Sequence, residues 1–108
     1  MPMPLLVRQT LAKYGDETFE AVAHRLRAAR FVANISKAEI SRSSWYAPDL
    51  QHIEAAEAGR VMPNYALLSF YWRRLRLNDE FFERGVVDHV PADIEDLLFA
   101  ALKPSRRK

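Results

Sequence analysis

The sequence predicts an all-α protein, and three observations support this fold class. Apolar residues recur at intervals of three and four along most of the chain, which is the spacing of one face of a helix. Residues typical of helix N-termini precede these stretches. The three glycines, Gly15, Gly59 and Gly85, stand where helices could end. The only valine-rich stretch, 86–90, is too short to predict a sheet.

Length and composition predict one domain, 1–108, with a single core. A hydrophobic content of 49% argues against wholesale disorder. The chain has no cysteine, which excludes disulfides and thiolate metal sites and favours a reducing cytosol. No apolar run reaches the roughly 18 residues of a membrane helix, and the first residues lack the pattern of a signal peptide. We therefore expect a cytoplasmic protein with no membrane partner.

The first third of the chain is predicted to form two helices. Leu5 to Tyr14 is predicted as a short leading helix that ends at Gly15. Asp16 can cap a longer second helix, 17–33. The apolar stripe of that helix consists of Phe19, Val22, Ala23, Leu26, Ala29 and Ala33.

A third, shorter helix is predicted over residues 36–44. Ser36 is followed three positions later by Glu39, and this pair is the sequence signature of a capping box. The capping box predicts that the helix begins directly after Ser36.

A fourth helix is predicted over residues 48–58, only a few residues further on. Pro48 and Asp49 favour its start, and Gly59 favours its end. Two short helices this close together predict a helix-turn-helix unit with its core at residues 36–59.

Three more helices are predicted in the second half of the chain. Asn64 can cap a helix over 65–75, Asn78 can cap a short one over 80–84, and Pro91 can open a last one. The apolar positions of the last helix are Ile94, Leu97, Leu98, Ala101 and Leu102. We expect the aromatic residues of this half to be core residues, namely Tyr65, Phe70, Tyr71, Trp72, Phe81 and Phe82.

The charge of the chain permits nucleic-acid binding without demanding it. The formal net charge is only +2, but cations gather locally and in a basic tail, 103–108. The two local groups are Arg25, Arg27 and Arg30, and Arg73, Arg74 and Arg76. A duplex binder needs a basic patch rather than a high total charge.

Residues 23–82 resemble the lambda-repressor-like, Cro/C1-type (xenobiotic-response-element-type) helix-turn-helix family. The similar pieces are Arg25-Leu-Arg27 with Arg30, Ile35-Ser-Lys-Ala-Glu-Ile40, Glu57-Ala-Gly59-Arg60 with Pro63, and Asn78-Asp-Glu-Phe-Phe82. The resemblance implies a five-helix domain, here with an extra N-terminal helix and an extra C-terminal helix.

The chain departs from the family pattern in the turn. Trp45-Tyr46-Ala47 stands where the family usually has a turn that contains a glycine. The segment from Ser36 to Glu57 is about two residues longer than the family pattern. In a second register, Glu54 would take the place of Glu57. We prefer Glu57, because it keeps the Glu-x-Gly spacing of the family.

The predicted 48–58 helix carries the candidate base-reading residues. If Leu50, Ile53, Ala56 and Glu57 face the core, then Gln51, His52 and Ala55 face outward, with Pro48 near the start. Gln pairs with adenine, His bonds a purine edge, and the Ala methyl contacts a thymine methyl. The alternative is that these residues are a solvated helix face.

The resemblance places Lys37, Arg60 and Asn64 on flanking phosphates, and Arg42 could join them. Each of the four could instead be an ordinary surface residue.

The resemblance also implies a structural ion pair between Arg30 and Glu57. Glu54 is the competing partner for Arg30. Removal of one member of a buried pair is strongly destabilising, so this pair would serve the fold rather than the binding.

These observations predict a sequence-specific DNA-binding transcriptional regulator, a repressor from a bacterium or phage, associated with the nucleoid. It would bind double-stranded DNA as a homodimer, with the 48–58 helix in the major groove. The last helix is a candidate dimer contact, and the alternative is that it packs on its own domain.

A second hypothesis keeps the scaffold but changes the partner. Asp49 and Glu54 lie on or near the proposed base-reading face, where they would repel phosphate. These acids favour a protein-interaction module, either antitoxin-like or an adaptor that binds the transcription machinery.

No enzyme, cofactor or metal site is predicted. The sequence has no phosphate-cradling glycine-rich loop and no GxSxG motif. His24, His52 and His89 lie far apart and lack the spacing of metal ligands. Glu54 and Glu57 lie one helical turn apart, but nothing nucleophilic accompanies them.

Overall fold

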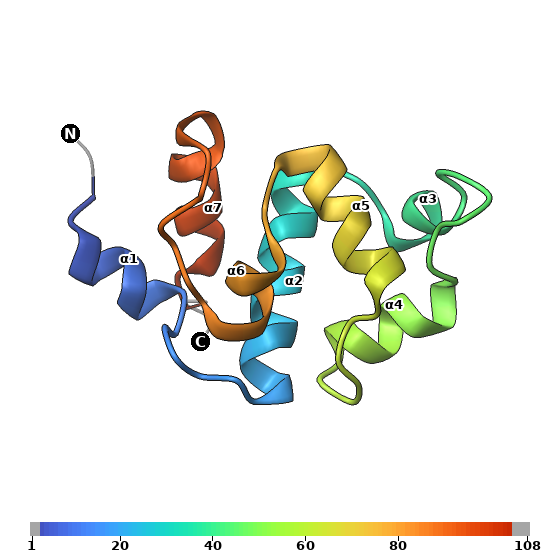
Figure 1. Cartoon of the computed structure of the whole chain (residues 1–108), viewed down its shortest axis with the longest axis horizontal. Coiled ribbons are helices and arrows are strands. Elements are labelled where there is room, and N and C mark those ends of the chain that lie inside the picture. The colour runs from blue at the N-terminus through green and yellow to red at the C-terminus, as the bar shows by residue number, and fades with distance from the viewer. Residues whose placement is uncertain (1–2, 105–108) are drawn as a thin grey trace.

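The computed structural model describes residues 3–104, and over this range the chain is all-helical, with no strand (Figure 1). The elements are α1 (Leu5–Leu11), α2 (Phe19–Ala33), α3 (Lys37–Ser41), α4 (Leu50–Glu57), α5 (Tyr65–Leu75), α6 (Asp79–Arg84), the 3₁₀ helix η1 (Ala92–Ile94) and α7 (Glu95–Leu102). The predicted all-α class is confirmed. The last four residues of the predicted basic tail lie outside the described residues.

Helix α2 runs through the middle of the molecule and contacts most of the other helices. In Figure 1, α1 and α7 lie at one end of the molecule and α3 and α4 at the other, with α2 between them. The long axis of the molecule measures 40 Å. The inward stripe of α2 includes Val22, Leu26 and Ala29, which are all buried. The core is therefore organised along α2.

The helix starts follow the capping side chains of the sequence. Ser36 Oγ accepts a hydrogen bond from the Glu39 N–H at 3.1 Å, and the Glu39 carboxylate accepts from the Ser36 N–H at 2.9 Å. This is the predicted capping box. The side chains of Asp49, Asn64 and Asn78 likewise accept from backbone N–H groups in the first turns of α4, α5 and α6.

The cap of α2 differs from the prediction. Thr18, rather than Asp16, is the N-cap, and its hydroxyl accepts from the Ala21 N–H at 3.2 Å. Asp16 supports this cap from outside the helix, because its carboxylate accepts from both the backbone N–H and the hydroxyl of Thr18. These two hydrogen bonds hold the pKa of Asp16 below its usual value.

Two predicted helices end three residues earlier than expected. α1 ends at Leu11, and a turn carries the chain from there to Gly15, whose φ is +84°. α3 ends at Ser41 rather than at residue 44. The hydroxyls of Ser41 and Ser43 donate to backbone carbonyls three residues earlier, a local bonding pattern that competes with helix continuation.

Some apolar side chains of the predicted helices are exposed. Phe70, Tyr71, Phe81 and Phe82 are buried, but the surface carries Phe19, Leu50, Tyr65, Trp72 and Leu97. The assignment of Leu50, Tyr65 and Trp72 to the core was therefore wrong, because helical spacing does not show where a buried stripe ends.

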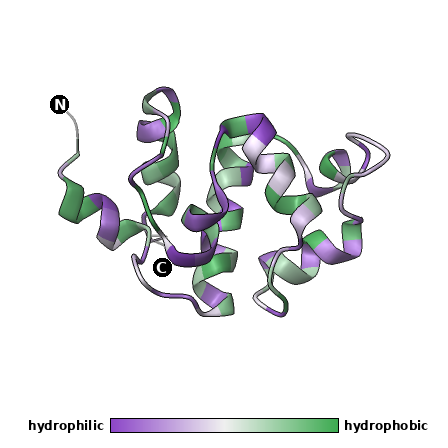
Figure 2. Ribbon diagram, viewed as in Figure 1, coloured by the Kyte–Doolittle hydropathy of each residue, from purple (hydrophilic) through white to green (hydrophobic). Residues whose placement is uncertain are grey.

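Helix α7 packs against α2 of its own chain. Leu98, Phe99 and Leu102 are buried in the core, while Leu97 is 55% exposed. Figure 2 shows hydrophobic residues along α7, whereas α4 alternates between hydrophobic and hydrophilic positions. Most of the stripe that was a candidate dimer contact is therefore covered within the chain, which agrees with the alternative of packing on its own domain.

A fully buried arginine joins α1, α2 and α6. The Arg25 guanidinium donates to the backbone carbonyls of Ala12, Lys13 and Asp16, each at 2.7 Å, and to that of Phe82 at 2.9 Å. Burial lowers the pKa of Arg25, but a guanidinium stays protonated in proteins. No ion pair among the described residues involves Arg25. Its charge is balanced by carbonyl dipoles.

Gly85 makes room for this arrangement. It ends α6 with a φ of +73°, and a Cβ there would lie 2.7 Å from the carbonyl oxygen of Ala12 and 2.8 Å from Nη2 of Arg25. Glycine is required both by the backbone conformation and by the close approach of these atoms.

No helix within residues 3–104 is both long enough and apolar enough to cross a membrane.

Candidate functional site

The inward side of α4 is fixed to α2 by a bidentate ion pair. Arg30 Nε donates to Glu57 Oε2 at 2.7 Å, and Arg30 Nη2 donates to Glu57 Oε1 at 3.1 Å. Glu57 is 6% exposed, and its hydrogen bonds with Arg30 raise the pKa of that arginine. The Arg27 guanidinium also donates to the Glu57 carbonyl, at 2.6 Å. Glu54, the competing partner, is exposed, so Glu57 is the residue that anchors α4.

The outward side of α4 carries most of the predicted base-reading side chains. Gln51 is exposed, and His52 and Ala55 are half-buried. Ile53 and Ala56, which alternate with them, are fully buried. Because Glu57 and these apolar residues occupy the inward face, Gln51 points away from the core.

Two residues at the start of α4 do not lie as predicted. Pro48 is buried, and it is therefore not available to contact a base. Leu50 was assigned to the core but is 38% exposed. The helix begins at Leu50 with Asp49 as its N-cap, so Pro48 precedes the helix by two residues and does not open it. Leu50, the first residue of the helix, lies outside its buried stripe.

His52 is held by the segment that precedes α5. Its Nε2 accepts a hydrogen bond from the Asn64 N–H at 2.9 Å, and the Asn64 Oδ1 in turn accepts from the Leu67 N–H at 3.0 Å. A neutral histidine that accepts at Nε2 carries its proton on Nδ1. The ring of His52 therefore keeps one donor for another partner, and the amide nitrogen of Asn64 is likewise left to donate.

The predicted phosphate-binding cations belong to the segments on either side of α4. Lys37 is half-buried in the first turn of α3, and Arg42 is exposed at the C-terminal end of that helix. Arg60 is exposed directly after α4. None of these three cations takes part in an ion pair among the described residues.

The outward side of α4 is also acidic. Glu54 is exposed, and Asp49 is exposed at the N-cap, where its carboxylate accepts from the His52 N–H at 2.8 Å. Asp49 therefore has a structural role, whereas Glu54 has no hydrogen-bond partner among the described residues. Helix α4 itself contains no lysine or arginine.

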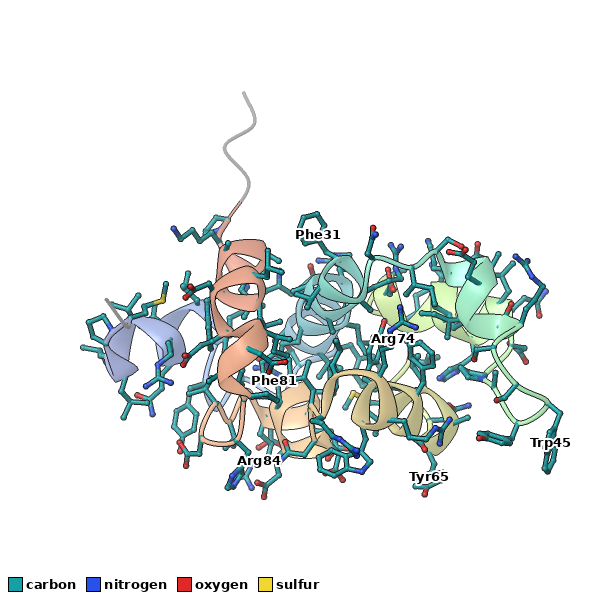
Figure 3. All side chains as sticks on the ribbon, turned by 90° about the horizontal axis from the view of Figure 1, so that it is seen from above. Phe31, Trp45, Tyr65, Arg74, Phe81 and Arg84 are labelled. Carbon is teal, nitrogen blue, oxygen red and sulfur yellow. The ribbon has the colours of Figure 1, made fainter. Side chains whose placement is uncertain are left out.

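The loop between α3 and α4 holds side chains that sequence reasoning assigned no role. Trp45 is 94% exposed and makes an edge-to-face contact with Tyr46, with ring centroids 5.2 Å apart. The Arg73 guanidinium lies over the Tyr46 ring at 4.8 Å. Figure 3 shows Trp45 at the tip of the molecule, beyond the helices. Adjacent tryptophan and tyrosine in a predicted turn were the only signal of this feature.

Within residues 3–104, no group of three or more histidine or carboxylate side chains is placed to hold a metal ion.

Comparison with models of known families, with curated proteins and with solved structures finds no match to this chain.

Proposed function

We propose that this chain is a sequence-specific DNA-binding transcriptional regulator that reads the major groove with α4. In this proposal α3 and α4 form a helix-turn-helix unit of the lambda-repressor-like type. The observation that carries it is the Arg30–Glu57 ion pair on the inward side of α4. It fixes the helix from behind and leaves Gln51 facing outward at one end of the molecule.

The proposal gives each of these side chains a role. Gln51 would contact adenine, the free Nδ1–H of His52 would donate to a base acceptor, and the Ala55 methyl would contact thymine. Lys37, Arg42, Arg60 and Asn64 would contact phosphates on either side of the groove. Glu54 would accept from cytosine N4, the contact that the groove offers to a carboxylate.

A regulator of this type would act as a homodimer on two half-sites about one helical turn apart. The resemblance favours a repressor. The buried leucines of α7 leave that helix little apolar surface for a partner, so we expect the dimer to use another surface.

The decisive experiment is selection of bound duplexes from a random pool, followed by retardation assays at several salt concentrations. We expect a two-fold symmetric site, with log affinity falling by about 0.9 per neutralised phosphate for each unit of log salt. Gln51→Ala should relax the preference at one base pair, and Lys37→Ala should weaken all sequences alike. No retardation of any duplex, or identical effects of the two substitutions, would contradict the proposal.

A second function is favoured by Glu54, Asp49 and the exposed Leu50. A helix face with acidic and apolar side chains and no cation suits a basic, partly apolar protein surface. In this case the chain would be an adaptor or antitoxin-like module. Duplex binding that is absent at low salt, together with a protein partner whose binding is lost in Glu54→Lys, would support this second function over the first.

A further inference from the structure

A small hollow lies between the α3–α4 loop and the second half of α5. It has a volume of about 220 Å³ and is lined by Ser43, Ser44, Tyr46, Phe70, Arg73 and Arg74. The lining includes two guanidinium groups and no carboxylate. A hollow of this size is smaller than the roughly 300–1,000 Å³ of sites for drug-sized ligands, so it suits one small group.

The two arginines are held in place and keep donors to spare. Arg73 Nη1 donates to Ser69 Oγ at 2.6 Å, and Arg74 Nη2 donates to the carbonyl of Ala33, the last residue of α2, at 3.1 Å. A guanidinium has five N–H donors, so most of them remain. Neither arginine takes part in an ion pair among the described residues. A guanidinium group binds phosphate oxygens through paired N–H donors, and both arginines line this hollow.

A buried hydroxyl at the same place lacks a partner. Ser44 Oγ is buried and makes no hydrogen bond within the described chain, whereas its neighbour Ser43 donates to the Ile40 carbonyl at 2.7 Å. A buried hydroxyl without a hydrogen-bond partner is unfavourable, because it has lost its hydrogen bonds to water. Ser44 lines the hollow, and its hydroxyl would reach an anion there only after a rotation of the side chain.

One acidic residue, Glu39, interacts electrostatically with Arg74, but its carboxylate is part of the capping box of α3. Glu39 lies within electrostatic reach of Arg74 and Arg42, but its carboxylate accepts from the Ser36 N–H, and that capping bond lowers its pKa. It does not line the hollow. Figure 3 shows Arg74 between α5 and the α2–α3 side of the molecule. The charged side chains that line the hollow itself are therefore Arg73 and Arg74 alone.

We propose that this hollow binds a phosphate group, and that the group belongs to a small phosphorylated metabolite rather than to DNA. Arg74 is ten residues from Asn64, which places it about 15 Å further along the α5 axis. The hollow is therefore separate from the phosphate contacts proposed for Arg60 and Asn64, but it lies next in the chain to Arg42, which is also a proposed phosphate contact. Its loop side also leads directly into α4, so a bound phosphate would order the segment that carries the base-reading helix.

The test is a calorimetric titration with inorganic phosphate and with glycerol phosphate, at constant ionic strength adjusted with sodium chloride. We expect saturable binding with a Kd on the order of 1 mM or tighter. Arg74→Gln should weaken it about tenfold or more, and Ser44→Ala by a smaller factor. Ser44→Ala removes an unsatisfied hydroxyl, so it should not lower the stability of the fold, and its effect on binding is then not an effect of unfolding.

Arg60→Gln is the matched control, because Arg60 is an exposed arginine on the proposed DNA-contacting side and does not line the hollow. It should leave the phosphate affinity unchanged. The absence of saturation at about 10 mM phosphate, or equal losses in Arg60→Gln and Arg74→Gln, would overturn the proposal.

A duplex titration separates the two phosphate sources. We expect Arg60→Gln to weaken duplex binding and Arg74→Gln to leave it unchanged. If Arg74→Gln weakens duplex binding instead and free phosphate fails to bind, the hollow serves DNA and the metabolite assignment is wrong. A chain that binds free phosphate but no duplex would keep this inference and remove the proposed function.

Discussion

Two arginines of α2, five residues apart, hold the two ends of the molecule in different ways. Arg25 is fully buried and binds four backbone carbonyls from the α1–α2 segment and α6. Arg30 is partly exposed and binds the carboxylate of Glu57 on α4 through two short hydrogen bonds, with a longer one to the Ile35 carbonyl. The first contact joins segments that are already packed into the core. The second fixes a short helix whose opposite side faces solvent.

The end of the molecule around Arg25 is therefore packed core, whereas the end around Arg30 holds a helix with one side facing solvent. Around Arg25, helices α6 and α7 cover α2, and the guanidinium donates to carbonyls at the C-terminal ends of α1 and α6. Around Arg30, α4 contributes only Ile53 and Ala56 as fully buried side chains. Much of the orientation of α4 therefore depends on a side-chain ion pair, and substitutions at the two ends should differ accordingly.

The largest effect is expected from Arg25→Met. The substitution leaves four carbonyls without their donor, and the bonds to Ala12 and Phe82 are buried. A carbonyl that water cannot reach costs about 1–3 kcal/mol when its partner is removed. The free energy of unfolding of a chain of this length is only about 5–15 kcal/mol, so we expect a loss of at least about 4 kcal/mol or failure to fold. Urea unfolding followed by circular dichroism measures it. A loss below about 1 kcal/mol would show that the carbonyls find water.

Arg30→Ala should come next, with a loss of about 3 kcal/mol, because it leaves the buried Glu57 carboxylate without its partner. Glu57→Gln should cost less, since the arginine left behind is partly exposed and can be hydrated. Unfolding experiments on both variants test the order. Equal losses, or a larger loss in Glu57→Gln, would mean that the unpaired, buried carboxylate is not what makes Arg30→Ala costly.

Gly85→Ala should cost about 2–3 kcal/mol. The substitution strains a backbone with φ +73° and places a methyl group against the Ala12 carbonyl and Arg25. Gly15→Ala is the matched control, because its φ is +84° but nothing lies within 4 Å of an added Cβ. Gly15→Ala should cost about 1–2 kcal/mol, and the difference between the two variants measures the close approach at Arg25.

The smallest effect concerns pH. Burial lowers the pKa of His24 below its usual 6.5, an effect that Lys13, Arg27 and Arg25 add to and that the hydrogen bond to the Leu102 carbonyl, at 2.9 Å, opposes. The unfolded state therefore binds more protons near pH 6.5, so stability is full above that pH and declines as the pH falls through it. The urea midpoint should be slightly lower at pH 5.5 than at pH 7.5, and His24→Gln should reduce that difference.

The local signals of the sequence predicted most of the secondary structure. The caps at Ser36, Asp49, Asn64 and Asn78 act within one helical turn, so their partners are fixed by position in the chain. The end of α3 was misplaced, because its serines bond to nearby carbonyls instead of continuing the helix.

The limits of burial could not be predicted in the same way. Phe19, Leu50 and Leu97 have the right spacing for their stripes, but whether a neighbouring helix covers them depends on tertiary packing. Pro48 was predicted to lie near the start of the base-reading face, and in the structure it is buried instead.

The contacts of Arg30 and Arg25 also differ in how far a sequence can predict them. The Arg30–Glu57 pair joins two side chains, so a family pattern could indicate it from residue types alone. The bonds of Arg25 end on carbonyl oxygens of residues 12, 13, 16 and 82, and every residue type has such an oxygen. No sequence pattern marks those partners, and the hollow at Arg73 and Arg74 escaped notice because it forms only when the α3–α4 loop meets α5.

Because Arg25 recognises only main-chain oxygens, the identities of its partners are almost free to drift. Lys13 and Asp16 could exchange for other residues over generations without weakening the clamp, provided that the path of the chain is kept. Relatives of this protein should therefore keep the arginine and Gly85 while the surrounding letters diverge, and this end of the molecule would hold its shape long after its sequence had become hard to recognise.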